Sequence, residues 1–250
     1  MKDKVPLSVA IITKNEEERL PECLKSISFA DDIIVVDSGS TDRTCEIARK
    51  FLCKVFIEEW KGYGPQKNSA VQKCRNEWVL IIDADERVPE ETRQKIVGIL
   101  KNPACDAYSF KRKNFLHGRW IKHCGWWPDR VIRLVKKDRG KFYNTVHERW
   151  VTDGKIGYLD ENIEHYSYSN YPDLIRKLNH YSTIKATELF ISGRKANPFS
   201  PVFHGITMFL RTYLLKRGFL DGMDGLVIAL TIGGGSFFKY AKLLELQRHK

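Results

Sequence analysis

The chain has 250 residues, of which 42% are hydrophobic and 12% aromatic, a composition that excludes a disordered protein and leaves room for one good-sized core. Its 42 Lys and Arg outnumber its 31 Asp and Glu, so the formal net charge is +11 and an anionic partner is favoured. The six cysteines form no Cys-x-x-Cys pair, which argues against a zinc ribbon or a redox motif and predicts reduced thiols in a cytoplasmic protein.

Apolar runs in the first third of the chain predict buried strands, at residues 7–12, 33–37, 54–57 and 78–83. Helical patterns separate these runs. One of them would be capped by Asn15, with Glu18 three positions on, and another would have Pro89 as its first residue. Strands that alternate with helices predict an α/β fold, with a mostly parallel sheet flanked by helices on both faces.

The pattern changes in the second half. Residues 107–165 consist of short extended runs rich in Trp, Tyr, Arg and His, as expected of an active-site wall built from strands and loops. From Pro172 onward the chain is helical and basic, and the tract 201–217 combines apolar aromatic faces with cations. Such helices are suited to an anionic membrane surface, or alternatively to packing on the catalytic domain or a second subunit. The glycines at 233–235 predict a break or a close-packing point.

The sequence predicts neither a membrane-spanning helix nor a secretion signal. The longest apolar run, residues 226–238, is shorter than the roughly 20 residues that a spanning helix needs. The polar N-terminus has no apolar segment of the signal-peptide kind. A cytoplasmic location is therefore expected.

Polar side chains follow three of the predicted strands: Thr13 and Asn15 after the first, Asp37 after the second, and Asp83 and Asp85 after the fourth. Ligands of open parallel sheets bind beyond the carboxyl ends of the strands. Two carboxylates two residues apart can hold Mg²⁺ or Mn²⁺, although a strand-end Asp taken alone more often caps the next turn. The chain has neither a Gly-x-Gly-x-x-Gly turn nor a P-loop, which argues against a dinucleotide oxidoreductase and a P-loop hydrolase.

Four segments, residues 7–15, 35–42, 66–68 and 81–86, resemble the inverting family 2 glycosyltransferases with the GT-A fold. The motifs at 126–134, 146–148 and 218–222 are similar to those of the WaaE/KdtX-type β-1,4-glucosyltransferases of lipopolysaccharide inner-core synthesis. This resemblance covers most of the chain and implies a GT-A type, Rossmann-like sheet.

We expect a catalytic domain at residues 1–168, with a nucleotide-sugar half at about 1–105 and an acceptor half at about 106–168. The basic helical C-terminal extension would occupy residues 169–250, and it is the part expected to associate with a membrane.

The resemblance also implies how the donor is bound. Asp37 would bind the uracil or ribose end of a UDP-sugar, with Thr13 and Asn15 in the same pocket. Asp83 would lie near the ribose and the metal, and Asp85 would be the principal ligand of Mg²⁺ or Mn²⁺.

Two further residues have two interpretations each. Lys67 would contact the pyrophosphate, or it is a solvated lysine on a helix. His165 would be a third metal ligand, or a structural histidine.

Catalysis requires a carboxylate that takes the proton of the acceptor hydroxyl. Glu148 is our assignment, because the motif at 146–148 occupies the place where the family carries its acidic base. Asp129 is the alternative, unless it forms a salt bridge within its loop. Arg130 and Arg133 could bind a phosphorylated acceptor, since Arg recognises phosphate in bidentate fashion, or they could form plain ion pairs.

Together these assignments predict a metal-dependent, inverting hexosyltransferase. It would move glucose from UDP-glucose to a lipid-linked saccharide acceptor, the lipopolysaccharide inner core, at the cytoplasmic face of the inner membrane. The first alternative is the transfer of another sugar in cell-envelope polysaccharide synthesis.

Two other classes have less support. A sugar nucleotidyltransferase would need a Gly-rich basic loop after the first strand, which residues 13–16 do not provide. A non-catalytic basic module for membranes or nucleic acid would leave the strand-end aspartates without a role. No nucleic-acid motif is present, so no nucleic-acid partner is expected.

Overall fold

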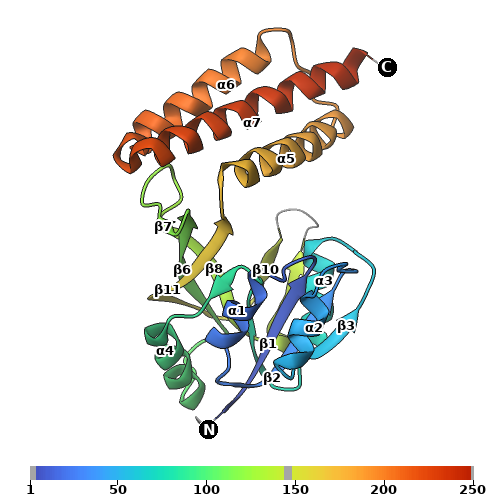
Figure 1. Cartoon of the computed structure of the whole chain (residues 1–250), viewed down its shortest axis with the longest axis vertical. Helices are drawn as coiled ribbons and strands as arrows, with labels where there is room; N and C mark the ends of the chain where they lie inside the picture. The colour runs from blue at the N-terminus through green and yellow to red at the C-terminus, as the bar shows by residue number, and fades with distance from the viewer. Residues whose placement is uncertain (1–3, 144–147, 249–250) are drawn as a thin grey trace. The chain divides into compact units, whose positions relative to one another are not determined.

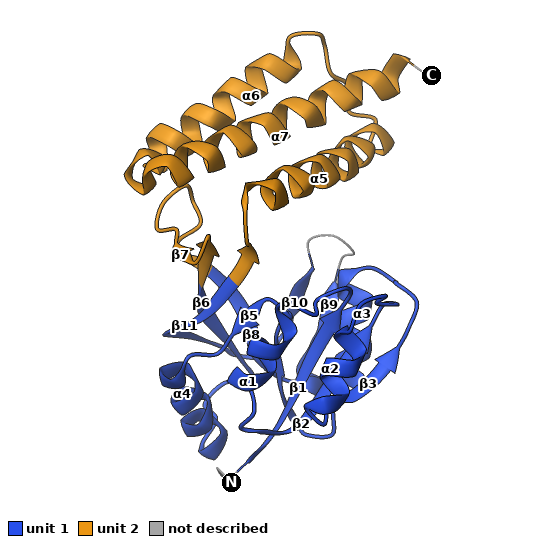
Figure 2. Ribbon diagram, viewed as in Figure 1, with its two compact units in different colours: residues 1–112, 130–165 blue, residues 113–129, 166–250 orange. Residues whose placement is uncertain are grey.

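The computed structural model describes residues 4–143 and 148–248, which divide into two compact units (Figure 2). Unit 1 comprises residues 1–112 and 130–165, and unit 2 comprises residues 113–129 and 166–250. This division differs from the expected boundary after residue 168, because residues 113–129 belong with the C-terminal helices. Their attachment is both apolar and polar. Leu116, Ile121 and Cys124 share a buried cluster with Leu174 and Ile228 of the helices. The backbone N–H of His123 donates to Asp221 at 2.8 Å, and the Arg119 guanidinium donates to the Asp221 carbonyl at 3.0 Å.

Half of the sheet in unit 1 is parallel, in the spatial order β3-β2-β1-β4 (Figure 1). These strands are β1 (Val5–Thr13), β2 (Ala30–Asp37), β3 (Lys54–Ile57) and β4 (Trp78–Ile81). They correspond to the four predicted strands, with β4 ending two residues earlier than expected. Their carboxyl ends carry the polar residues that the sequence singled out.

The other half of the sheet is mixed, which corrects the expectation of a mostly parallel sheet. It continues from β4 in the order β8-β6-β11-β5, and both the β4–β8 and the β11–β5 pairs are antiparallel. These strands are β5 (Glu86–Arg87), β6 (Ala107–Leu116), β8 (Asp129–Lys136) and β11 (Ile156–Tyr168). Smaller pieces are β7 (Arg119–Trp120), paired with the end of β6 in unit 2, and the β9 (Lys141–Tyr143) and β10 (Arg149–Val151) ribbon.

Helices cover both faces of this sheet, as predicted. Successive residues of a strand point to opposite faces, and accordingly β1 sends Val9 and Ile11 into one apolar cluster and Ala10 into another. The first cluster lies under helices α1 (Leu20–Ser26), α2 (Thr44–Lys50) and α4 (Glu90–Lys101), and the second lies under α3 (Tyr63–Gln72).

Two predicted helix starts need correction. Helix α1 begins at Leu20, and Asn15 lies ahead of it with φ of 55°, so Asn15 does not cap that helix. Pro89 is the cap residue before α4, one position earlier than expected.

Unit 2 contains the predicted helical extension. Its helices are α5 (Tyr171–Ile191), α6 (Ser200–Leu210), a π-helical turn (Arg211–Leu215), a 3₁₀ turn (Gly218–Asp221) and α7 (Gly222–Arg248). The three glycines at 233–235 lie inside α7, so the helix does not break there. Close packing is the correct interpretation of Gly233, because a Cβ at this position would lie 3.0 Å from the Gly205 carbonyl oxygen and from Phe209 Cβ.

Within the described residues, one helical segment is long and apolar enough to cross a membrane by length and composition alone. It runs from Gly218 to Arg248, with a mean hydropathy of 1.2 over its best 18 residues. The sequence-based estimate missed it because it considered only the uninterrupted apolar run at 226–238, whereas the helix continues through the polar and small residues that flank this run. The α7 helix packs against α5 and α6 in the same unit.

Candidate active site

The first part of the candidate site is formed where β1 and β2 end side by side. Thr13 pairs with Asp37 in the parallel register, and its hydroxyl donates to the Asp37 carboxylate at 2.9 Å. Asp37 is buried and also accepts from the backbone N–H groups of Gly39 and Ser40, at 3.0 and 2.7 Å. Burial by itself raises the pKa of this carboxyl, but the hydrogen bonds from Ser40 and Thr13 outweigh it and lower the pKa. Asp37 is therefore held as a carboxylate.

Asn15 belongs to the same corner of the molecule. Its backbone N–H donates to Ser40 Oγ at 2.8 Å, and its side-chain oxygen accepts from the backbone N–H of Thr41 at 2.8 Å. These bonds fasten the turn after β2 to the turn after β1. The structure thus brings Thr13, Asn15 and Asp37 together. The structure adds Ser40 to this corner, because it contacts both Asn15 and Asp37.

The second part is a cluster of charges around Lys67, on helix α3. Lys67 Nζ lies 2.8 Å from Asp83 Oδ1 and 2.8 Å from Glu148 Oε1. Only 4% of the lysine side chain is exposed, so the alternative of a solvated helix lysine is wrong. Asp83 and Glu148 come from distant parts of the sequence and are joined by this one ammonium group. Val146 and His147 of the same motif lie outside the described residues.

Arg133, on β8, forms an ion pair with the other carboxylate oxygen of Asp83. Its guanidinium lies 2.6 Å from Asp83 Oδ2 and 2.6 Å from Glu86 Oε1. Burial alone would raise the pKa of Asp83, but Arg133 and Lys67 beside it hold that pKa well below its usual range. Although burial opposes its charge, the neighbouring Asp83 and Glu86 raise the pKa of Arg133. Both oxygens of Asp83 are therefore paired with cations.

Glu86 is the residue that the sequence analysis overlooked. It is fully buried, and its carboxylate contacts Arg133, the Arg112 guanidinium at 3.4 Å and the backbone N–H of Asp83 at 3.1 Å. A glutamate directly after the Asp-x-Asp motif was visible in the sequence, but nothing there indicated that the short strand β5 would bury it beside an arginine.

The structure does not bring Arg130 and Arg133 together. They lie three residues apart on β8 and therefore on opposite faces of the sheet. Arg130 donates to the Leu159 carbonyl at 2.9 Å and lies 3.7 Å from Asp160, while Arg133 is buried among carboxylates. The plain ion-pair alternative thus describes the contacts of both arginines, and no shared phosphate clamp is formed.

Asp129 has other neighbours. It belongs to unit 2, where Asn114 Nδ2 lies 3.5 Å from its carboxylate, whereas Glu148 belongs to unit 1. Of the two candidate bases, Glu148 is the one whose contact with Lys67, and through it with Asp83, the structure shows.

Asp85 and His165 form a separate pair near this cluster. His165 Nε2 lies 3.4 Å from Asp85 Oδ2, because β11 pairs with β5 and sets His165 opposite Glu86. Each side chain is 15% exposed. A carboxylate oxygen and an imidazole nitrogen at this spacing fit a transition-metal ion such as Mn²⁺. Across residues 4–143 and 148–248, no group of three His, Cys, Asp or Glu is gathered for a metal.

The chain is similar to proteins of known family over most of its length. The family model described as glycosyl transferase family 2 matches residues 8–160. An uncharacterized glycosyltransferase of Rickettsia typhi is 35% identical, covering 96% of this chain and 87% of that protein. The lipopolysaccharide core biosynthesis glycosyltransferase LpsC of Rhizobium meliloti is 30% identical, covering 98% and 94% of the two chains.

Among solved structures, a mannosyltransferase of Pyrobaculum calidifontis, in complex with GDP-Man and Mn²⁺, superposes with a TM-score of 0.54. It is 17% identical and covers 97% of this chain and 88% of its own, a similarity that concerns the fold.

Proposed function

The chain belongs to glycosyl transferase family 2 and has a GT-A type fold, and on that premise we propose that it is an inverting hexosyltransferase with Glu148 as its catalytic base. The observation that carries the proposal is the position of Lys67, 2.8 Å from both Asp83 and Glu148. This contact joins the strand-end aspartate expected at the donor to a carboxylate that can accept a proton.

The donor in this proposal is a nucleotide sugar whose nucleoside end is bound at Asp37. A buried, ionised carboxylate can accept hydrogen bonds from the N–H of a uracil or from ribose hydroxyls. Thr13 and Asn15 would complete this pocket. UDP-glucose is the donor that we propose, on the resemblance of the motifs at 126–134, 146–148 and 218–222.

Asp85 and His165 would hold a divalent metal, Mg²⁺ or Mn²⁺, together with oxygens of the donor diphosphate. When bound, such an ion offsets the negative charge that develops on the leaving diphosphate. Asp83 is a weaker candidate ligand than the sequence implied, because Lys67 and Arg133 occupy both of its oxygens. We assign it instead to the ribose side of the site, with Arg133 and Glu86 as positioning residues.

The transfer step places a definite demand on Glu148. As the acceptor hydroxyl oxygen forms its bond to the anomeric carbon, the bond from that carbon to the diphosphate oxygen breaks, and the nucleoside diphosphate leaves with the bonding electrons. The hydroxyl proton passes to the Glu148 carboxylate. Lys67, which contacts this carboxylate, would hold it in place and interact with the pyrophosphate of the donor.

The acceptor that we propose is a lipid-linked saccharide of the cell envelope, with the lipopolysaccharide inner core as the specific candidate. Support comes from the LpsC relative, which is a lipopolysaccharide core biosynthesis enzyme and matches over nearly its whole length. A lipid-linked acceptor places the enzyme at a membrane. We therefore propose peripheral association with an anionic membrane surface on the cytoplasmic side, through the basic helices of unit 2.

The test is a donor screen followed by a transfer assay. UDP-glucose, UDP-galactose, UDP-N-acetylglucosamine and GDP-mannose are compared by thermal shift in the presence of Mn²⁺ or Mg²⁺. The screen is repeated with Asp37→Asn, which should lose the shift. Release of nucleoside diphosphate is then measured with purified inner-core lipopolysaccharide. Stabilisation by UDP-glucose and inversion at the anomeric carbon by NMR are the expected results. A preference for another donor would redirect the assignment of the sugar, and retention of configuration would overturn the role of Glu148.

A further inference from the structure

Helices α6 and α7 share an exposed apolar face that has no partner among the described residues of unit 2. On α6 its residues recur at helical spacing, and they include Val202, Ile206 and Leu210, which are 52%, 55% and 45% exposed. On α7 the corresponding side chains are Leu230 and Phe237, at 55% and 37% exposed. Contiguous apolar faces of this kind on soluble domains mark interaction sites.

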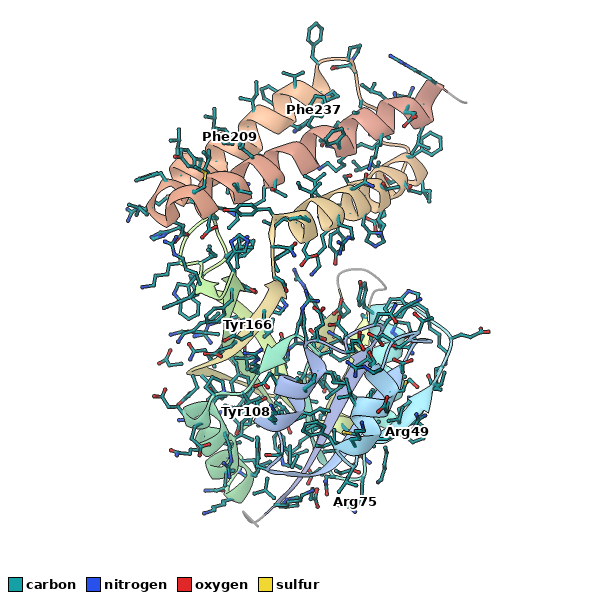
Figure 3. The ribbon with its side chains drawn as sticks, in the orientation of Figure 1. Arg49, Arg75, Tyr108, Tyr166, Phe209 and Phe237 are labelled. Atoms are coloured by element: carbon teal, nitrogen blue, oxygen red, sulfur yellow. The ribbon has the colours of Figure 1, made fainter. Side chains whose placement is uncertain are left out.

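A groove runs along this face because glycines let the two helices approach closely. A Cβ at Gly205 would lie 3.1 Å from Phe237 Cβ and 3.4 Å from the Gly233 carbonyl oxygen. The resulting hollow has a volume of about 410 Å³. Figure 3 shows Phe209 on α6 and Phe237 on α7, two of its lining side chains. No lining residue is charged: they are Val202, Gly205, Ile206, Phe209, Leu230, Gly233, Gly234 and Phe237.

The residues that line this groove lie in two long stretches of sequence without acidic residues. No Asp or Glu occurs in residues 189–220 or 225–244. The first stretch contains five cations, and all of them are exposed: Arg194, Lys195, Arg211, Lys216 and Arg217. None of the five forms an ion pair with any residue of the described chain. They lie before and after α6, so cations stand at both ends of the apolar helix.

Helix α7 is not free to be surrounded by lipid, because α5 covers another side of it. Gly234 and Gly235 of α7 face Leu178 of α5. A Cβ added at these glycines would lie 3.5 and 3.6 Å, respectively, from the Leu178 side chain. Lys242 Nζ donates to Asn179 Oδ1 and Ser182 Oγ on α5, each at 2.8 Å. A helix with one side covered by protein and one apolar side exposed is suited to lie in the plane of a membrane interface rather than to span it.

We infer that the α6–α7 face inserts into the interface of an anionic bilayer, and that the groove floored by Gly205 and Gly233 takes a lipid acyl chain. Arg194, Lys195, Arg211 and Arg217 contact lipid phosphates at the same surface, whereas the Lys216 side chain lies against Gly125. This inference rests on the membrane association in the proposed function and deepens it, since it names the inserting face and the part of the lipid that is bound. The occupant is a membrane lipid rather than a second copy of the chain, because two copies of this face would bring like charges together.

The first test is co-sedimentation of the full chain with vesicles of dioleoylphosphatidylglycerol or dioleoylphosphatidylcholine. The wild-type protein should bind the anionic vesicles and bind the neutral vesicles far more weakly. Ile206→Glu and Leu230→Glu should each weaken binding by about tenfold or more, since each places a charge in exposed apolar surface that the bilayer would bury. The control is Ile175→Glu on α5, where the side chain is 61% exposed and outside the groove. It should change binding by less than about twofold. Circular dichroism checks that the variants remain folded.

The second test asks whether an acyl chain enters the groove. Leu230→Trp and Ile175→Trp are bound to phosphatidylglycerol vesicles that carry bromine on carbons 9 and 10 of the chain. Bromine should quench the added fluorescence of Leu230→Trp and leave that of Ile175→Trp unchanged, each measured relative to the parent protein. Absence of quenching in vesicle-bound Leu230→Trp would overturn the groove assignment.

The outcomes separate the inference from the function on which it rests. If the wild type binds anionic vesicles and the two groove variants bind equally well, the inserting face is wrong while peripheral association stands. If sedimentation equilibrium shows a dimer that Ile206→Glu dissociates without loss of vesicle binding, the face is a protein interface and the inference fails. If the wild type binds no vesicles, both fail, while sugar transfer is still judged by the separate donor screen.

Discussion

Asp83 and Glu148 both accept a hydrogen bond from the same ammonium group, at 2.8 Å each from Lys67 Nζ. The lysine is almost fully buried, and Arg133 takes the second oxygen of Asp83. The residue assigned to the donor and the residue assigned to the acceptor proton thus share one cation. Any change in Lys67 therefore acts on both.

Glu148→Gln tests the base. The amide keeps the size of the side chain but cannot take up the acceptor proton, so kcat should fall by about 10²- to 10⁴-fold. Affinity for UDP-glucose, measured by calorimetry with Mn²⁺, should stay within about threefold, because ground-state donor binding does not use the proton acceptor. Asp129→Asn is the matched control. If only Asp129→Asn loses turnover, the role of base passes to Asp129.

Lys67→Met tests the shared cation. The thioether has a similar length and no charge, so Asp83 and Glu148 would lose a common partner in a mostly buried site. Breaking a buried ion pair by removing one partner costs about 3–5 kcal/mol, which should appear in the free energy of unfolding by urea. Lys61→Met is a suitable comparison, because that lysine is 54% exposed in its pair with Glu58 and should cost less than about 1 kcal/mol. Equal costs for the two variants would contradict a structural role for Lys67.

The sequence predicted the parallel half of the fold, and that Thr13, Asn15 and Asp37 would lie together, for a local reason. Thr13, Asn15 and Asp37 follow two apolar runs whose pattern predicts buried strands, and parallel strands bring their carboxyl ends to one edge. The antiparallel half was not predictable in the same way. Strand β8 pairs with β4 from a distant part of the chain, and its alternation decides that Arg133 points into the site and Arg130 away from it.

The same limit explains why Glu86 was missed and Lys67 was left open. Both are charged residues in polar sequence surroundings, and in each case burial is created by a partner far along the chain. Arg133 makes the burial of Glu86 tolerable, and Asp83 with Glu148 does so for Lys67. Periodicity cannot reveal such partners, because they depend on strand order. Asn15 was misread for the opposite reason, since its local pattern fits a helix cap but its side chain instead binds the turn at Thr41.

Asp85→Asn tests the metal. If Asp85 and His165 hold the ion, chelation by EDTA should abolish transfer, and Mn²⁺ or Mg²⁺ should restore it in the wild type only. Binding of Mn²⁺, measured by electron paramagnetic resonance with UDP present, should weaken by about 10- to 100-fold in Asp85→Asn. His165→Gln should show a smaller loss, since one ligand remains charged. Asp129→Asn serves as the control that retains Mn²⁺ affinity. Full turnover without a divalent ion would contradict the proposed site.

Glu86→Gln tests the positioning of Asp83. Glu86 is fully buried against Arg133, so replacing its carboxylate by an amide leaves Arg133 with less compensating charge and should cost about 3–5 kcal/mol of unfolding free energy. The KM for the donor should rise as well, because Asp83 loses part of its support. In Glu90→Gln, the side chain is 59% exposed and pairs with Arg93, and stability should change by less than about 1 kcal/mol. An unchanged donor KM in a folded Glu86→Gln enzyme would limit Glu86 to a structural role.

Glu58→Gln tests the acid side of the stability profile, away from the proposed chemistry. Hydrogen bonds from Lys73 and Ser69 lower the pKa of Glu58 from its ordinary value of 4.5 to about 2. The folded pKa is the lower one, so this group stabilises the protein above pH 4.5, and the contribution is lost as the pH falls towards about 2. The wild type should therefore unfold at a higher temperature than Glu58→Gln at pH 7, and the difference should shrink at pH 3. Calorimetry at the two pH values measures this, and a gap of constant size would show that the Lys73 contact does not hold Glu58 ionised.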